Sequence, residues 1–287
     1  MSAHPIVLNS SNYNPNYSTP TYELSFPSEI NASGQTDYDI AIQSVSVFNN
    51  SFNISANQNN NTFSISWLGT TYNGTIPDGY YSVSDLNYTI QNFCIANNLY
   101  LINTSNNKNS YYVEVLANSI YYKLQLNTFL IPTSTQAAAL SLVKPAGATW
   151  SFPTTATTPT LTFGAKLGQY FGLPAGTYPA TPQTTQNTTY STITPIVQTV
   201  NSYIFTCNII NSPYSKPNNY FFSLPINTPY GSQINYTNSQ MCWIPINKGI
   251  YKTLQIQILD QNFNYIKWND NEIVLTLLVR ERPKNIM

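Results

Sequence analysis

The sequence predicts a mainly β protein, built as a single jelly-roll β-sandwich with an inserted α+β domain. Aromatic residues make up 14% of the chain and accompany many Ile, Val and Thr, a composition that favours strands. Apolar and polar residues alternate in short segments of residues 1–58 and 196–287. Residues 59–195 differ in character and contain the clearest helical pattern, so we expect them to form the insertion.

Eight strands are expected outside the insertion. They are predicted near residues 5–8, 21–27, 38–48, 201–210, 219–226, 239–245, 252–260 and 272–280. Eight strands around an inserted block is the number that a jelly roll needs. In the third strand the alternation shifts by one residue after Ile42 and resumes at Val45, which predicts a β-bulge. A polar arm precedes the second strand and ends near residue 20.

The insertion is expected to begin after a polar stretch, residues 49–61, which we interpret as a long turn and a boundary. Ser82 and Asp85 have the spacing of a capping box. Apolar residues follow at helical spacing, so a helix is predicted over residues 82–97. Residues 111–116 and 120–126 flank the short segment Ala117-Asn118-Ser119 and predict a hairpin.

The second half of the insertion is less regular. One short helix is expected within residues 161–173, with Gly172 near its end. Residues 174–197 are rich in Thr, Pro and Gln and are predicted to be a linker or surface loop.

The chain carries very little charge. It has 11 basic and 11 acidic residues, and charged residues make up 8% of it, against about 25% in an ordinary soluble protein. Its solubility must therefore depend on hydroxyl and amide groups. A neutral surface of this kind is typical of subunits of assemblies, fibres and adhesins, whereas a DNA-binding domain needs clustered Lys and Arg.

The three cysteines, Cys94, Cys207 and Cys242, stand far apart and form no zinc or redox motif. We expect buried free thiols in a reducing compartment, with one disulfide plus one free thiol as the alternative. The first residues lack the pattern of a signal peptide, and no apolar run approaches the length of a membrane-spanning helix.

No catalytic, cofactor-binding or metal-binding residue is predicted. The only histidine, His4, is expected to be solvated rather than to act as a base. Asp37 and Asp39 could supply oxygen ligands to Ca²⁺, but the sequence arranges no further ligand, so we expect a solvated pair. Asp260 before Gln-Asn is typical of a turn. The glycines of residues 164–172 match no nucleotide-binding loop.

The last predicted strand is apolar on both faces, because Val274 and Leu278 add a second apolar face to the first one. Such a strand must be covered by its own chain or by a neighbouring subunit. Val274, Leu278, Arg280 and Arg282 are therefore candidate subunit contacts.

The only concentrated charge is the basic tail formed by Arg280, Arg282 and Lys284. Two interpretations stay open for it. The tail could contact packaged nucleic acid, or it could be a solvated terminus balanced by Glu281.

Three segments, in this order, resemble the vertex (penton, or minor capsid) proteins of virophages and of Polinton/Maverick-type elements. They are DGYYSVSDLNYTI (78–90), LGQYFGL (167–173) and WIPINKGIYKTLQIQILDQNFNYIKWNDNEIVLTLLVRERP (243–283). The resemblance implies a single jelly roll with an insertion domain. It also implies a homopentamer at each fivefold vertex of an icosahedral virion, beside trimers of a double-jelly-roll major capsid protein. Proteins of this family have no catalytic residues, so none is transferred to this chain.

The leading hypothesis is therefore a capsid vertex protein, made in the host cell, whose insertion could contact the host surface. A ring of five buries two different faces of each subunit, and the weakly charged, partly apolar sandwich suits such an interface. The alternative is a viral fibre or a receptor- or glycan-binding adhesin, since the 23 tyrosines could form a sugar-binding platform. An enzyme is the least supported hypothesis, because titratable groups are few.

Overall fold

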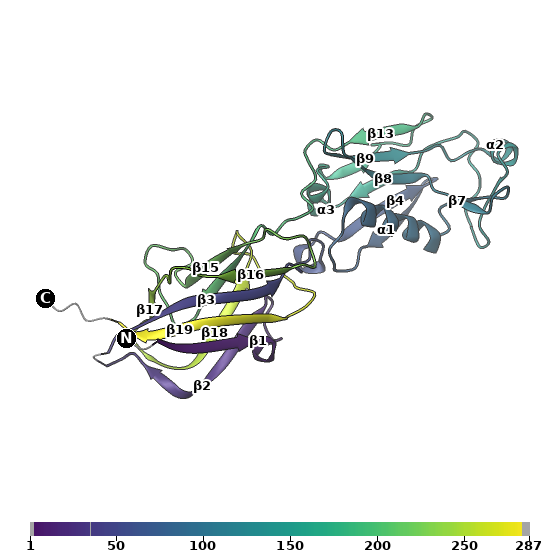
Figure 1. Cartoon of the computed structure of the whole chain (residues 1–287). Coiled ribbons are helices and arrows are strands. Elements are labelled where there is room, and N and C mark those ends of the chain that lie inside the picture. Colours follow the sequence, from purple (N-terminus) through teal and green to yellow (C-terminus); the bar gives the residue numbers. More distant parts are fainter. Residues whose placement is uncertain (1–2, 35, 283–287) are drawn as a thin grey trace. The chain divides into compact units, whose positions relative to one another are not determined.

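The computed structural model describes residues 3–34 and 36–282, so the predicted tail residue Lys284 lies outside the described residues (Figure 1). The chain is mainly β, with several antiparallel sheets. It divides into two compact units. Unit 1 contains Met1–Phe52 and Val200–Met287, and unit 2 contains Asn53–Thr199. Residues 53–58 and 196–199, which were expected in the jelly roll, thus belong to unit 2.

Unit 1 contains two antiparallel sheets. The first has the order β1 (Ala3–Asn9), β19 (Ile273–Glu281), β3 (Tyr38–Phe48) and β16 (Gln233–Thr237), and β17 (Ile244–Pro245) also pairs with β3. The second has the order β15 (Tyr220–Pro225), β14 (Ser202–Cys207), β18 (Ile250–Leu259) and β2 (Thr21–Asn31). A short 3₁₀ helix, η1 (Ser10–Asn12), follows β1.

The core of unit 1 is one cluster of buried side chains that draws on both sheets. Leu275 and Leu277 of β19 and Leu254 and Ile256 of β18 belong to it and are almost fully buried. Full burial of one such aliphatic side chain stabilises the fold by roughly 1.5–3 kcal/mol. This alternation of buried and open positions fixes the register of each strand, because a shift by one residue would expose the whole apolar set.

The predicted bulge in β3 is confirmed. Thr276 of β19 pairs with Ser44, whereas the next residue, Leu277, pairs with Ile42, so Gln43 is the extra residue. The predicted strand at 239–245 is wrong, since only Ile244–Pro245 pairs there. The strand in this region is β16, which the sequence analysis missed because only Ile234 of its side chains is buried.

Residues 49–61 are more than a turn. They contain a 3₁₀ helix, η2 (Ala56–Gln58), and buried asparagines on both sides of it. Asn53 is 2% exposed, donates from Nδ2 to the carbonyls of Tyr81 (2.8 Å) and Val197 (2.9 Å), and accepts from the Tyr81 N–H (2.8 Å). Because buried amides must be paired, this polar stretch ties three distant segments of unit 2 together.

Unit 2 contains three antiparallel sheets and three α-helices, besides η2. The first sheet has the order β12 (Gly176–Tyr178), β11 (Thr160–Phe163), β4 (Thr62–Trp67) and β5 (Thr70–Thr75). The second has the order β13 (Asn187–Tyr190), β9 (Lys123–Thr128) and β8 (Val113–Asn118). The third has the order β10 (Leu142–Val143), β6 (Leu101–Asn103) and β7 (Lys108–Ser110). The helices are α1 (Val83–Ala96), α2 (Ser134–Ala139) and α3 (Ala165–Tyr170).

Helix α1 confirms the predicted helix over residues 82–97. Ser82 is its N-cap, and Ser82 and Asp85 form both hydrogen bonds of a capping box. Its buried residues recur at helical spacing and join the core of unit 2. They are Val83, Leu86, Ile90 and Cys94.

The predicted hairpin is confirmed as β8 and β9, but its turn spans residues 119–122 rather than 117–119. The short helix within 161–173 is confirmed as α3, and Gly172 follows it with φ +73°. A Cβ at Gly172 would lie 2.2 Å from the carbonyl oxygen of Ile193, so the position needs glycine. The linker predicted at 174–197 is wrong, because it contains β12 and β13. Their polar sequences lack alternation, and pairing with neighbouring strands defines them.

Candidate subunit-contact surface

The first sheet of unit 1 has one face in the core and one open face. We call the open side the outer face, and it consists of Pro5, Val7, Asn9, Ser44, Ser46, Val274, Thr276 and Leu278. These residues share a face because cross-strand partners do: Val274 pairs with Asn9 and Ser46, and Thr276 pairs with Val7 and Ser44. No residue of this set is charged, and the same face continues beyond Leu278 to Arg280, which is in register with Asp39.

The predicted second apolar face of the last strand is therefore real and only partly covered. Val274 is 49% exposed and Val7 of the neighbouring strand is 51% exposed, while Leu275 and Leu277 are buried. Leu278 is half-buried and lies between Pro5 and Ala41 in the register. The sequence analysis named Val274 and Leu278 but missed Val7, whose apolar run Pro5–Leu8 was the available signal.

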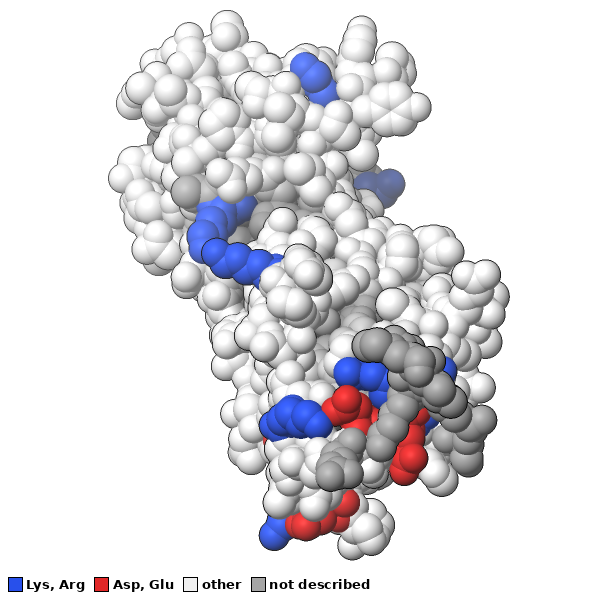
Figure 2. Space-filling model, turned by 90° about the vertical axis from the view of Figure 1, so that its left-hand side faces the viewer, with Lys and Arg blue, Asp and Glu red and all other residues white. Residues whose placement is uncertain are grey.

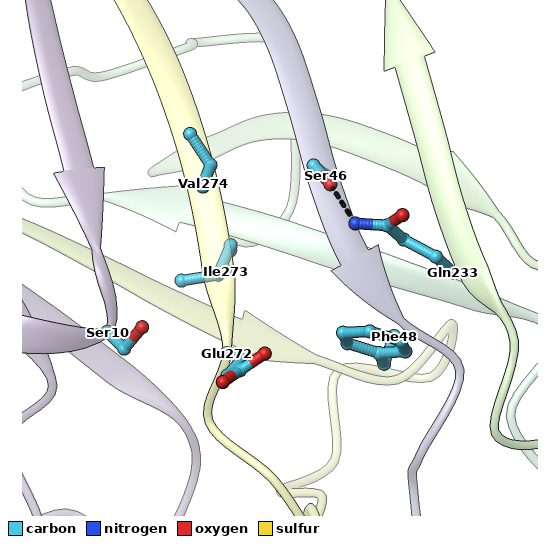
Figure 3. A pocket seen from close by; sticks show the side chains of 7 residues that line it. All are labelled: Ser10, Ser46, Phe48, Gln233, Glu272, Ile273 and Val274. Atoms are coloured by element: carbon cyan, nitrogen blue, oxygen red, sulfur yellow. Dashed lines mark hydrogen bonds between the residues drawn. The ribbon is translucent and has the colours of Figure 1, made fainter.

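A depression of about 280 Å³ lies at one end of the outer face (Figure 3). Its lining is formed by Ser10, Ser46, Phe48, Gln233, Glu272, Ile273 and Val274. Figure 3 shows Gln233 reaching across from β16, where its Nε2 donates to the Ser46 hydroxyl at 2.8 Å. Glu272 supplies the carboxylate of this lining. The depression thus combines hydroxyl, amide and carboxylate groups with the exposed side chain of Val274.

The opposite end of the sheet carries an ion-pair cluster around a buried carboxylate. Asp39 is 5% exposed and pairs with Arg282 (Nε–Oδ1, 2.8 Å) and with Arg280 (Nη2–Oδ2, 3.5 Å). Asp37 pairs with Lys248 (Nζ–Oδ1, 2.5 Å) and with Arg282 (Nη1–Oδ2, 3.8 Å). The expectation of a solvated pair is therefore wrong for Asp39, because β19 and the residue after it bring Arg280 and Arg282 to this carboxylate, whereas the Asp37 side chain is 44% exposed.

The same contacts bear on one of the two interpretations of the basic tail. The partners of Arg280 and Arg282 are Asp39 and Asp37, rather than solvent balanced by Glu281, whereas the contact with packaged nucleic acid stays a prediction. The Arg280 guanidinium also lies 3.9 Å from the centre of the Trp243 ring, a cation–π contact. Both arginine side chains thus connect the C-terminal end of β19 to β3. Figure 2 shows basic and acidic groups gathered together beside the grey atoms, while most of the visible face is uncharged.

A second depression in unit 1 has a volume of about 560 Å³. Apolar side chains of Ile6, Phe26 and Ile30 line it together with His4 and Glu29. His4 is exposed and lies within β1, paired with Val279. Among residues 3–34 and 36–282, no group of three or more His, Cys, Asp or Glu side chains is arranged to hold a metal ion.

Asp260 lies in a turn, as its sequence context predicts. It accepts hydrogen bonds from the N–H groups of Asn262 and Asn264, both at 2.8 Å, which confirms the turn.

The three cysteines are free thiols. Cys94 and Cys207 are buried, as expected, and burial raises the pKa of each to about 12. Cys242 is free but exposed, so the expectation of burial is wrong for it. In the described part of the chain, no helix is both long and apolar enough to cross a membrane.

Comparisons with known proteins find likeness to solved structures. No protein-family model and no curated protein match the chain. Among solved structures, the crystal structure of the selenomethionine-labelled mavirus penton protein matches with 9% identity and a TM-score of 0.43, over 98% of this chain and 99% of that one.

Proposed function

We propose that this chain is a structural capsid protein, and that five copies form the capsomer at the fivefold vertices of an icosahedral virion. In this proposal unit 1 is a single jelly roll that contacts the neighbouring subunits and the double-jelly-roll major capsid protein. Unit 2 is an inserted domain that can contact the host surface. The chain has a structural role and is not an enzyme. The observation that carries the proposal is the strand order of unit 1.

The eight longer strands of unit 1 are nested in pairs. In chain order, the first strand pairs with the eighth (β1–β19) and the third with the sixth (β3–β16) in one sheet. The second pairs with the seventh (β2–β18) and the fourth with the fifth (β15–β14) in the other. This winding supports a jelly roll, an architecture common in viral capsid proteins. Unit 2 falls in the connection between the third and fourth strands.

The outer face supports a contact between subunits. It is uncharged, its Val7 and Val274 side chains are about half exposed, and it adjoins the depression at Glu272. A closed ring needs two different complementary faces on each copy, and a stable interface buries at least about 1,000 Å². Val274 and Leu278 lie on this face. Arg280 and Arg282 remain contact candidates, although the side chains of both already pair with Asp39.

The molar mass of the purified protein in solution, measured by light scattering, tests the proposal. We expect about 160 kDa, five times the 32.2 kDa chain. A trimer would favour the fibre or adhesin hypothesis. A chain that stays monomeric both alone and with the major capsid protein would contradict the vertex role.

A further inference from the structure

The sheet β13-β9-β8 of unit 2 has an open face that carries exposed tyrosines. Leu116, Gln125 and Tyr190 are in register across its three strands and therefore share a face. The other face, with Val115 and Leu126, is buried in the core of unit 2. Leu116 and Tyr190 are 38% and 46% exposed. This open face is thus available to a ligand.

The turn of the β8–β9 hairpin adds three large exposed side chains beside this face. Ile120, Tyr121 and Tyr122 are 80%, 65% and 74% exposed. The rings of Tyr121 and Tyr190 are 6.5 Å apart, centre to centre, and meet edge to face at 75°. Tyr122 has φ 50°, a left-handed conformation that is a strained one for a bulky residue. Strained residues cluster at functional sites, and here the strain accompanies two consecutive tyrosines that face solvent.

A row of hydrogen-bonded polar side chains follows the same face. Asn118 Nδ2 donates to Gln125 Oε1 (3.2 Å), and Gln125 Nε2 donates to Asn127 Oδ1 (3.1 Å). Asn127 Nδ2 donates to Glu114 Oε2 (2.9 Å), and the Thr188 hydroxyl donates to Asn127 Oδ1 (2.9 Å). Each amide is held in one orientation by its neighbours. The row therefore presents fixed donors and acceptors, and a ligand would not have to order them.

We propose that this surface, the tyrosine platform (Tyr121, Tyr122, Tyr190, Gln125, Asn118 and Glu114), binds a neutral oligosaccharide. A sugar ring has an apolar C–H face and a rim of hydroxyls. A tyrosine ring packs against the first, and amides with a carboxylate pair with the second. Lys123 lies beside the platform at one end of the row and Glu114 at the other, so their charges offset each other and the sheet face as a whole has no net charge.

Two other occupants fit the platform less well. A lipid surface would bury the Glu114 carboxylate and the amide row away from water, which is unfavourable without new partners. A membrane-binding surface is also rich in Lys and Arg, whereas Lys123 alone supplies positive charge to this sheet face. A second copy of the chain would have to pair the same polar row with itself.

The inference goes beyond the capsid role. It rests on that role in one respect only, because a capsid protein has a reason to bind a cell surface. The molar mass in solution tests the proposed ring, whereas oligosaccharide binding tests the proposed platform. The failure of one proposal is therefore distinguishable from the failure of the other.

The test is binding of the full chain to an array of neutral hexose and N-acetylhexosamine oligosaccharides, with sialylated oligosaccharides and phosphatidylserine vesicles as further probes. We expect binding to neutral oligosaccharides. Tyr121→Ala and Tyr190→Ala should each weaken it about tenfold, and Gln125→Ala should weaken it with the rings intact. Tyr88→Ala is the matched control, since Tyr88 is 67% exposed on α1 of the same unit and should leave affinity unchanged.

Three outcomes would overturn the inference. They are no binding to any neutral oligosaccharide, binding to sialylated oligosaccharides or vesicles alone, and equal loss of affinity in the Tyr88 control. The substituted tyrosines are exposed, so circular dichroism should show each variant folded.

Discussion

Arg282 donates from Nε to Oδ1 of Asp39 at 2.8 Å, and this bond joins the residue that follows β19 to β3. The Asp39 side chain is 8% exposed, while that of Asp37 beside it is 44% exposed. The chain thus has a carboxylate in a buried ion pair, Asp39, and two residues before it a carboxylate in an exposed ion pair, Asp37.

Asp39→Asn should lower the free energy of unfolding by about 2–3 kcal/mol, because it removes the counter-charge of the partly buried Arg280 and the nearer of the two carboxylates that pair with Arg282. Asp37→Asn is the control and should cost less than about 1 kcal/mol, since exposed pairs contribute little. Denaturant unfolding monitored by tyrosine and tryptophan fluorescence measures both. Equal costs for the two variants would show that burial of Asp39 does not matter.

The stability of unit 1 should fall as the pH rises above about 9. Burial raises the pKa of the Cys207 thiol from 9.0 to about 12, so the folded chain keeps this proton while the unfolded chain loses it. Unfolding then releases a proton between pH 9 and 12, and the free energy of unfolding decreases over this range. Burial also raises the pKa of Tyr22, which adds to the same trend above pH 10.

Cys207→Ala separates this effect from general alkaline unfolding. The variant should lose stability less steeply than the parent chain between pH 9 and 11, by up to about 1.4 kcal/mol per pH unit. Denaturant titrations at pH 8, 9, 10 and 11 provide the comparison. Parallel curves for the two chains would mean that the thiol is ionised to the same extent in both states.

Much of unit 1 could be predicted from the sequence, because its strands alternate strongly. The alternation predicts strand β3, its bulge at Gln43 and the last strand. Strand β16 was missed since its partner, rather than its own pattern, defines it. The buried asparagines were missed for a related reason: polarity alone predicts exposure, and only the fold provides the carbonyl groups that pair with Asn53.

The candidate surface was predictable only in part. Val274 and Leu278 follow from alternation within one strand. Val7 and Ser46 lie beside them through pairing between strands far apart in the sequence. The ion pairs of Arg280 and Arg282 with Asp39 and Asp37 depend on the same long-range strand pairing, which a local sequence pattern does not contain.

Replacing both Val7 and Val274 with Ser should dissociate the proposed ring without unfolding the chain. The two side chains are about half exposed in the single chain, so their loss should change its stability by less than about 1 kcal/mol. Ile250→Ser is the control, because Ile250 is equally exposed (53%) but belongs to the other sheet. Light scattering and thermal unfolding measure the two properties. A double variant with the parent molar mass would exclude the outer face from the interface.

Unit 1 should fold without unit 2. The buried clusters of the two units share no residue, so replacing residues 53–199 with a flexible Gly/Ser linker should leave a cooperatively folding β protein. Circular dichroism and a thermal transition test this, with isolated residues 53–199 as the reciprocal chain. Complete loss of structure in the shortened chain would contradict the division into an inserted domain and a jelly roll.

Electron cryo-microscopy of the assembled protein tests the capsid proposal most directly. The account predicts rings of five, in which the outer face carrying Val7 and Val274 lies against the neighbouring subunit. Rings of another symmetry, or pentamers in which that face remains open to solvent, would contradict it.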